Sequence, residues 1–405
     1  MPEFANAIAG MLEGNWDEQD VIQGALVAIR KHLGMEVAYF SEFVGGMSVF
    51  RRVDAPGLEH LIKPGDSRSL DDVYCTHILE GRLPELIPDT AREPLACALP
   101  ITDAVPIGSH ASLPIRLRDG TPFGMFCCLS PRANPSLNQR DLDTMRVFAD
   151  LVARQVNADL DQRRLLRERR AVIEEVIQDR RFEMVYQPIV DLVGMETVAY
   201  EALCRFAPQP YRSPDQWFQD ATIVGLGVEL ELLVVEAAVA DLAVLPDGMS
   251  LSINVSAATA VSGGLAAALG TRSLNRIILE LTEHDRVEDY GLLQSNLAML
   301  RSAGLRLAVD DAGAGYSGLQ HLVRIAPDVI KMDMSLTRGI DRDPARRALA
   351  SAMIFYGRET GSILLAEGIE TEAELAMLRR LGFTRGQGYL LGRPARPPGR
   401  AVRSG

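Results

Sequence analysis

Polar residues recur at one position of a repeating pattern in the second half of the chain. We expect each to lie at the carboxyl end of a short apolar run of the kind that forms a buried strand, with Glu201 at the end of its own run. The positions are Glu201, Asn254, Glu280 with Glu283, Asp310 with Asp311, Lys331 with Asp333, Glu367 with Glu370, and Gln387. Because the carboxyl ends of barrel strands converge on one mouth, we expect these side chains to meet there. Acids gathered so closely raise one another's pKa unless cations lie between them.

Oxygen ligands of this kind favour hard cations, so we expect two divalent ions, Mg²⁺ or Mn²⁺, at the mouth. Asp310 and Asp311 are neighbours at the end of a run, where the chain turns. One carboxylate can then bridge both ions while the next binds only one. Two cations about 4 Å apart can activate a water and stabilise the leaving oxygen in phosphoryl transfer. The alternative is a set of solvated acids at loop starts, but their recurrence at matching points favours a metal site.

Eight apolar runs must position these groups, and helical patterns separate most of them. The runs are FEMVYQPIVDL, TVAYEALCRF, MSLSINVS, RIILELTE, LRLAVDD, DVIKMD, ILLAEGIE and the segment around GFTRGQGYLL. This alternation predicts an α/β fold, a TIM-like (β/α)8 barrel over residues 181–396.

Residues 1–155 show a different pattern of helical and strand-like segments, which predicts a separate α+β domain. A helical pattern over 17–33 precedes one hairpin at Gly45-Gly46, and a second hairpin turns at Asp119-Gly120. The five cysteines show no zinc-type spacing, so we expect reduced, partly buried thiols. They are Cys75, Cys97, Cys127, Cys128 and Cys204.

A long helix is predicted after Pro135, and it joins the two domains through a linker at residues 156–180. Apolar residues recur along it at spacings of three and four, and the charged stretch DQRRLLRERR lies within it. Such a stripe predicts a coiled coil between two chains and hence a homodimer. The alternative is a single amphipathic helix that lies on its own domain.

The chain has 405 residues and a formal net charge of −12. Long nucleic acid is therefore not expected as a partner, since a phosphate backbone needs a basic surface. No window resembles a membrane span or a secretion signal, so we expect a cytoplasmic protein without a membrane partner. Residues 397–405 are expected to form a flexible tail.

An ordered set of motifs then becomes informative: YQPIVDL, EALCR, INVS, ELTE, DDAGAGYSG, IKMD, AEGIE and QGYLLGRP. Together they resemble the EAL domain family, phosphodiesterases specific for cyclic di-GMP. The first domain resembles a GAF domain through YCTHILEGRLPELIPDT and SLPIRLRDGTPFGMFCCL. GAF domains bind varied small ligands or serve in dimerisation, so an unknown small ligand is possible there. Tyr74, Cys75 and His77 are candidate pocket residues, although core packing is the favoured interpretation of all three.

The EAL resemblance implies roles for individual residues and the linear dinucleotide pGpG as the product. It implies that Glu201, Asn254, Glu280 and Asp310 bind a first metal, and that Asp310, Asp311 and Glu367 bind a second. It implies a catalytic set of Lys331, Glu367, Glu283 and Glu370, in which Lys331 orients or deprotonates the attacking water. It implies substrate contacts from Gln187, Leu203, Arg205, Asp333 and Gln387. Asp333 and Glu370 would also position Lys331 and the metal ligands, and Glu283 would anchor the loop after Asp311.

The loop after the two aspartates departs from the family pattern DDFGTGYSS. Ala312 replaces an aromatic residue, Ala314 a threonine and Gly318 a serine. All ligating positions are retained, so activity is expected. Two alternatives stay open: a catalytically weak receptor for cyclic di-GMP that signals through protein contacts, and a phosphodiesterase for another dinucleotide.

Overall fold

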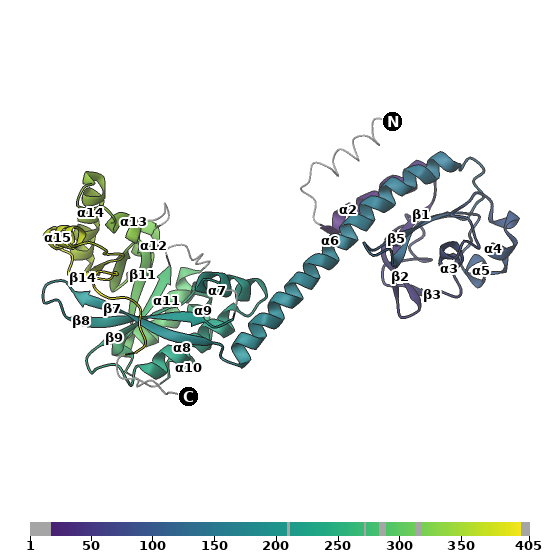
Figure 1. Cartoon of the computed structure of the whole chain (residues 1–405). Coiled ribbons are helices and arrows are strands. Elements are labelled where there is room, and N and C mark those ends of the chain that lie inside the picture. Colours follow the sequence, from purple (N-terminus) through teal and green to yellow (C-terminus); the bar gives the residue numbers. More distant parts are fainter. Residues whose placement is uncertain (1–17, 209–210, 271–272, 283–288, 313–317, 398–405) are drawn as a thin grey trace. The chain divides into compact units, whose positions relative to one another are not determined.

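The computed structural model describes residues 18–208, 211–270, 273–282, 289–312 and 318–397 (Figure 1). Contacts divide the chain into two compact units, Met1–Leu165 and Leu166–Gly405. Each unit has its own sheet and its own core. None of the helices within the described ranges combines the length and the apolar character needed to span a bilayer.

Unit 1 contains a six-stranded antiparallel sheet with the strand order β3-β2-β1-β6-β5-β4. Its strands are β1 (Val37–Val44), β2 (Met47–Asp54), β3 (Ser67–Ser69), β4 (Leu86–Ile87), β5 (Ser109–Arg116) and β6 (Pro122–Ser130). Both predicted hairpins are confirmed, since β1 pairs with β2 and β5 pairs with β6. Gly45 and Gly46 join the first pair with φ angles of 56° and 79°, which glycine adopts without strain.

Helices cover both faces of this sheet (Figure 1). One face packs against α2 (Glu18–Leu33) and the first part of α6 (Gln139–Gln178). The opposite face packs against three short helices and a 3-10 turn. These are α3 (Tyr74–Leu79), η1 (Thr90–Arg92), α4 (Pro94–Ala98) and α5 (Pro100–Ala104).

Most apolar side chains along α6 are buried in the cores of the two units. Its first part, which includes Met145, Phe148 and Val152, is buried in the core of unit 1. Its last part, which includes Ile173, is buried in the core of unit 2. This packing accounts for the apolar residues at the two ends of the helix, and the coiled coil between two chains stays a prediction. Exposed apolar side chains remain near the middle of the helix, at Leu165 and Val172.

Unit 2 is a closed eight-stranded barrel with the order β10-β11-β12-β13-β14-β7-β8-β9. Its strands are β7 (Phe182–Asp191), β8 (Thr197–Phe206), β9 (Ser250–Asn254), β10 (Ile277–Thr282), β11 (Arg306–Ala312), β12 (Val329–Met332), β13 (Ile363–Ala366) and β14 (Arg385–Gly386). The predicted TIM-like barrel is confirmed, with one difference from a regular (β/α)8 barrel. β7 runs antiparallel to both of its neighbours, β8 and β14. A short turn therefore replaces the first crossover helix, because antiparallel strands need only a hairpin.

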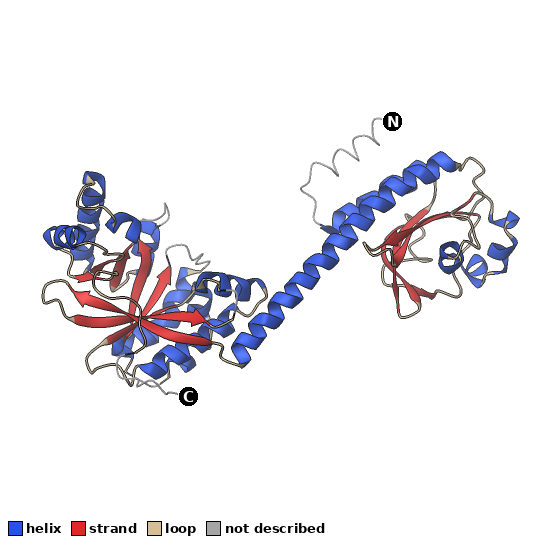
Figure 2. Ribbon diagram, viewed as in Figure 1, coloured by secondary structure: helices blue, strands red, loops and turns tan. Residues whose placement is uncertain are grey.

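Helices surround this barrel (Figure 2). They are α7 (Pro214–Ile223), α8 (Gly227–Asp241), α9 (Ala257–Val261), α10 (Leu265–Leu269), η2 (Leu274–Arg276), α11 (Tyr290–Ser302), α12 (Gly318–Ile325), α13 (Met334–Thr337), α14 (Pro344–Thr360) and α15 (Glu372–Leu381). Along β10 the two faces alternate as strand geometry requires. Ile277 and Leu279 pack outward in the helix-facing core, whereas Ile278 packs inward.

The inside of the barrel holds a thin apolar layer below a polar one. The apolar layer consists of Ile189, Ala199, Ile278, Ala308, Val329 and Leu365. Two residues further along β10 lies Glu280, and two further along β12 lies Lys331, both almost fully buried. Period-two alternation therefore places these polar groups inside the barrel, toward the carboxyl ends of the parallel strands.

Gly388 is required where two loops at this end of the barrel approach each other. The backbone of Ile369 bonds to both sides of Gly388, donating from its amide nitrogen to the Gln387 carbonyl and accepting from Leu390. A Cβ atom at Gly388 would lie 2.2 Å from the backbone nitrogen and oxygen of Ile369. No real Cβ contact is that short, so the loops would have to separate.

We therefore predict that Gly388→Ala lowers the free energy of unfolding by about 1–3 kcal/mol or more, the range for overpacking a tight site. Urea denaturation followed by circular dichroism measures the change. The matched control is Gly263→Ala, because a Cβ there meets nothing within 4 Å. Equal stability of the two variants would contradict the prediction.

Candidate functional site

The ammonium group of Lys331 is the centre of the polar layer. Lys331 is 1% exposed. Its Nζ atom lies 2.7 Å from Glu280 Oε2, 2.9 Å from Glu367 Oε1, 3.0 Å from Asp310 Oδ1 and 3.5 Å from Glu201 Oε1. One cation thus faces four carboxylates that come from β8, β10, β11 and the residue after β13. Residues separated by up to 166 positions in sequence meet at one nitrogen atom.

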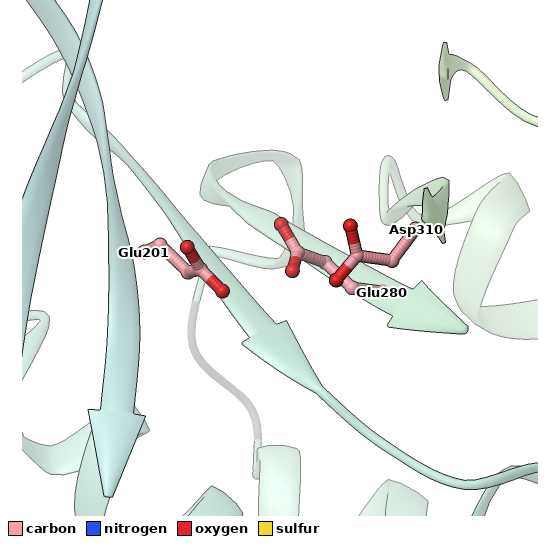
Figure 3. Close-up of side chains that lie close together, drawn as sticks. All are labelled: Glu201, Glu280 and Asp310. Atoms are coloured by element: carbon pink, nitrogen blue, oxygen red, sulfur yellow. The ribbon is translucent and has the colours of Figure 1, made fainter. Parts of the chain in front are cut away.

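The carboxylates form two groups that share Asp310. Glu201, Glu280 and Asp310 offer oxygens that all lie within 4.8 Å of one another (Figure 3). Asp310, Asp311 and Glu367 form a second group that meets the same criterion. Five carboxylates against one ammonium leave an excess of negative charge with oxygen donors only. This donor set fits hard divalent cations such as Mg²⁺ or Mn²⁺.

An irregularity in β11 brings both aspartates to the site. Val309 pairs with Ile330 and Ala312 with Met332, so three steps on β11 match two steps on β12. The extra residue is a β-bulge, a feature that redirects side chains next to active sites. Asp311 has a φ of 56°, the left-handed region that costs a non-glycine residue about 1–3 kcal/mol. Its amide also donates to Asp310 Oδ1 at 2.9 Å.

Burial and mutual charge push the titrations of this cluster in different directions. Burial raises the pKa of Glu280 well above its usual value, with Lys331 opposing and the charges of Glu201 and Asp310 adding. Burial likewise raises the pKa of Glu367 to about 8. For Glu201, burial is outweighed by Lys331 and by amide hydrogen bonds, so its pKa is lowered. Burial would lower the pKa of Lys331, but the surrounding carboxylates raise it well above its usual value.

A chain of amide groups holds Glu201 from the other side. Gln387 Nε2 donates to Glu201 Oε2 at 2.5 Å and to Gln187 Oε1 at 3.0 Å, and Asn254 Nδ2 donates to Glu201 Oε1 at 3.0 Å. Gln187 Nε2 in turn donates to the carbonyl of Gly392 at 3.1 Å. Gln387 Oε1 is buried and accepts no hydrogen bond within the described residues. An additional donor beside these carboxylates would satisfy this oxygen.

The sequence had indicated that Glu201 ends its strand, but the structure places it elsewhere. It lies in the middle of the ten-residue β8, paired in register with Gln187 on β7 and Ser252 on β9. Leu203 and Arg205 follow at intervals of two, so they share the face of Glu201 and lie nearer the carboxyl end of β8. Arg205 is half-buried, and its Nη1 donates to the carbonyl of Cys204.

Two predicted residues, Asp333 and Glu370, form no ion pair with Lys331 among the described residues. The Asp333 carboxylate accepts from the amide of Ser335 at 2.9 Å and caps α13. Glu370 is exposed and pairs with Arg338 at 3.0 Å. Glu283 lies outside the described residues. Any effect of Asp333 on Lys331 would act through the backbone, because Lys331 and Asp333 are two residues apart.

Two residues of the site had not been singled out from the sequence. Ser252 Oγ donates to Glu280 Oε1 and so fixes the carboxylate that Lys331 holds at its other oxygen. The signal was its position two residues before Asn254, on the same face of β9. Glu374 is buried and accepts from the amides of Gly339, Glu370 and Thr371, which ties down the loop after Glu367. Here the signal was the capping-box pattern Thr371-x-x-Glu374.

The predicted pocket residues of unit 1 pack in its core. Tyr74, Cys75 and His77 are buried, and all five cysteines are free thiols. Tyr74 donates to or accepts from Thr102 at 2.6 Å and lies edge-on to His110. Tyr74 and His110 line a cavity of about 30 Å³, which has room for about one water molecule.

Comparison with known proteins decides the family. Residues 169–394, more than half of the chain, match the EAL domain. The chain belongs to the EAL domain family. Residues 17–156 match the GAF domain, so the predicted order of a GAF domain followed by an EAL domain is confirmed.

Two curated relatives from Pseudomonas aeruginosa resemble the EAL part. The bifunctional diguanylate cyclase/cyclic di-GMP phosphodiesterase MucR is 30% identical over 234 residues, which are 55% of this chain and 34% of MucR. The cyclic di-GMP phosphodiesterase PA2567 is 33% identical over 229 residues, which are 53% of this chain and 39% of PA2567. This EAL-domain chain thus matches well under half of the length of either relative.

Two solved structures resemble the fold. The PaMucR phosphodiesterase in complex with c-di-GMP matches with a TM-score of 0.51 and 29% identity, over 56% of this chain and 98% of that one. The EAL enzyme Bd1971, bound to cAMP and cyclic-di-GMP, matches with a TM-score of 0.55 over 89% of this chain and 91% of that one. At 20% identity, the second likeness shows the fold alone.

The ion cluster yields a stability prediction. In metal-free protein, Lys331→Met leaves four carboxylates, two of them buried, without their cation, which should lower the free energy of unfolding by about 3–5 kcal/mol. Urea denaturation in the presence of a chelator measures this loss. Added Mn²⁺ should restore more stability to the variant than it adds to the unaltered protein, because a cation replaces the missing positive charge.

The control for this variant is Arg338→Met. It breaks the exposed pair with Glu370, and such pairs contribute about 0–1 kcal/mol. If Lys331→Met costs no more than this control, the cluster does not depend on Lys331.

Proposed function

We propose that this chain hydrolyses cyclic di-GMP to linear pGpG with two divalent cations, Mg²⁺ or Mn²⁺, bound at the mouth of the EAL barrel. The observation that carries the proposal is the pair of carboxylate groups that share Asp310 around Lys331. Membership of the EAL domain family supports it. So does the likeness to PA2567, named as a cyclic di-GMP phosphodiesterase, and to PaMucR, solved in complex with c-di-GMP.

The residues divide into two ligand sets in this proposal. Glu201, Asn254, Glu280 and Asp310 would hold one cation, and Asp310, Asp311 and Glu367 the other. Bound there, the cations would supply Lewis acidity and lower the pKa of a water molecule. The chain itself provides the spacing, because the bulge at Asp310 and Asp311 directs two adjacent carboxylates into one site.

Lys331 would orient the attacking water and stabilise the negative charge that develops on the phosphate. Its side chain is fixed by four carboxylates and almost fully buried, so it is held in place before substrate arrives. Preorganised charge of this kind needs no rearrangement during the reaction. Gln387 would help to hold the water or substrate through its buried Oε1.

Residues nearer the mouth would contact the dinucleotide. Leu203 and Arg205 lie on the site face of β8, beyond Glu201 and toward the strand's carboxyl end. The guanidinium fork of Arg205 suits a phosphate group. Gln187 and Asp333 complete the proposed contacts. The cytoplasmic location stays a prediction.

The proposal is tested with purified full chain, cyclic di-GMP and either Mg²⁺ or Mn²⁺, with products separated by chromatography. We expect pGpG to form, and we expect no product once a chelator removes the cations. Glu201→Gln should lower kcat by at least about 100-fold, because it removes a charged ligand and disturbs the Lys331 cluster. Glu196→Gln, an exposed glutamate in the β7–β8 turn, is the matched control and should keep full activity.

Other outcomes distinguish the alternatives. Tight binding of cyclic di-GMP without turnover would support the catalytically weak receptor. Faster hydrolysis of cyclic di-AMP or of a linear dinucleotide would support a different substrate.

We further propose that the chain forms a homodimer through α6 and that unit 1 regulates the EAL domain. Leu165 and Val172 are 54% and 42% exposed. They lie seven residues apart on α6, which places them on one face of the helix, as at equivalent positions of a coiled coil. Arg and Glu side chains flank them in the sequence.

The dimer is tested by light scattering on the full chain. We expect a dimer for the unaltered protein and a monomer for the double variant Leu165→Glu/Val172→Glu, because charges at the seam repel. Val147→Glu lies on the same helix with a 61% exposed side chain and serves as the control. A dimer that survives the double variant would place the interface elsewhere.

Regulation is tested with a truncated chain that begins at Leu166, the first residue of unit 2. We expect its kcat/KM for cyclic di-GMP to differ from that of the full chain, since removal of unit 1 removes the regulating domain. Identical values at equal cation concentration would refute regulation by unit 1 under those conditions.

A further inference from the structure

A cavity of about 230 Å³ lies at the end of the EAL barrel opposite the carboxylate cluster. Its lining includes the first residues of five parallel strands, which places it at their amino-terminal ends. These residues are Ser250, Arg306, Val329, Ile363 and Arg385. The proposed metal ligands lie at or beyond the middle of their strands, and of these only Glu280 also lines this cavity.

Small inward-facing side chains leave this space open. Barrels of this type are normally filled by layers of bulky branched residues. Here Ala199, Ser250 and Ser252 occupy inward positions on β8 and β9. Val329 and Leu365 provide apolar walls on the other side. At about 30 Å³ per water molecule the volume would hold about eight waters, and it lies below the range of about 300–1,000 Å³ typical of pockets for larger ligands.

Two arginines give the cavity its charge. Arg306 is half-buried and donates to Ser250 Oγ at 2.5 Å, and no carboxylate within the described residues forms an ion pair with it. The negative charge of Asp328 acts on Arg306, but the Asp328 carboxylate accepts hydrogen bonds from Arg301 and from the amide of Leu307. Burial lowers the pKa of Arg306, and the like charge of Arg385 adds to this effect. Arg385 has Asp191 as its own partner.

We propose that this cavity binds a short-chain alkyl monocarboxylate. Its carboxylate would lie between Arg306 and Arg385, where planar guanidinium groups bind carboxylates by paired hydrogen bonds. Its alkyl chain would pack on Val329 and Leu365. Of the two cavity arginines, Arg385 pairs with Asp191 and Arg306 has no ion-pair partner among the described residues, so a ligand with a single negative charge matches the site. The apolar walls disfavour inorganic phosphate.

The alkyl chain of the bound ligand would end beside the polar layer. Glu280 and Ser252 also line the cavity, and Ser252 donates to Glu280 Oε1 while Lys331 contacts the other oxygen, Oε2. A ligand there would contact the support of a proposed metal ligand without entering the mouth. The site does not depend on the proposed hydrolysis, since none of its defining arginines belongs to that machinery.

The test is calorimetric titration of full chain, saturated with Mg²⁺, with sodium hexanoate. We expect one site per chain. Acetate lacks the alkyl chain, 1-hexanol lacks the charge and inorganic phosphate lacks the apolar part, so each should bind at least about tenfold more weakly. Arg306→Gln should weaken hexanoate binding by at least about tenfold. Arg342→Gln removes the same charge at an exposed position and should leave binding unchanged.

A second variant keeps the test decisive if Arg306→Gln folds poorly. Ile363 lines the cavity and is 37% exposed, so Ile363→Trp can narrow the entrance without altering charge. It should weaken hexanoate binding as well. Absence of hexanoate binding, equal binding to Arg306→Gln in its folded form, or tighter binding of phosphate would each overturn the proposal.

Discussion

The buried ammonium of Lys331 is the constraint on which the EAL barrel's polar interior depends. A charge this deep is tolerated only when opposite charges and hydrogen bonds compensate its lost hydration. Four carboxylates provide that compensation, and each comes from a different part of the barrel. The cluster therefore exists only once the sheet has closed. The carboxylates carry more negative charge than one ammonium group neutralises, so the closed barrel can bind additional cations.

The bulge at Asp310 and Asp311 is the second requirement, because a regular strand would direct adjacent side chains to opposite faces. The left-handed conformation of Asp311 and the extra residue in β11 change that direction. The strained backbone is held by neighbours on both sides, since β11 pairs with β10 and β12. Strain kept at a site by rigid surroundings is typical of functional positions. Local irregularity and global closure thus act together to place one shared carboxylate between two groups.

Sequence reasoning found the barrel and the acids because both leave periodic signals: buried strands as apolar runs, and acids at matching places. It missed the antiparallel direction of β7, since alternation along a strand is the same in either direction. It placed Glu201 at a strand end because the length of β8 depends on pairing with β7 and β9. The cap made by Asp333 and the pair made by Glu370 are local contacts that spacing alone cannot assign.

The interior of the barrel also differs between its two ends in a way that follows from side-chain size. Toward the mouth, long polar side chains reach one another across the barrel and fill it with hydrogen bonds and charge. Toward the other end, the side chains of Ala199 and Ser250 are too short to reach the opposite wall of the barrel, so space remains. The thin apolar layer lines this lower region, and Glu280 of the cluster borders the region directly. Ser252 lines the lower region while it bonds to Glu280 in the upper one. Any change in the packing of that layer must therefore be felt directly by a carboxylate of the cluster, because close-packed interiors transmit strain rather than absorb it.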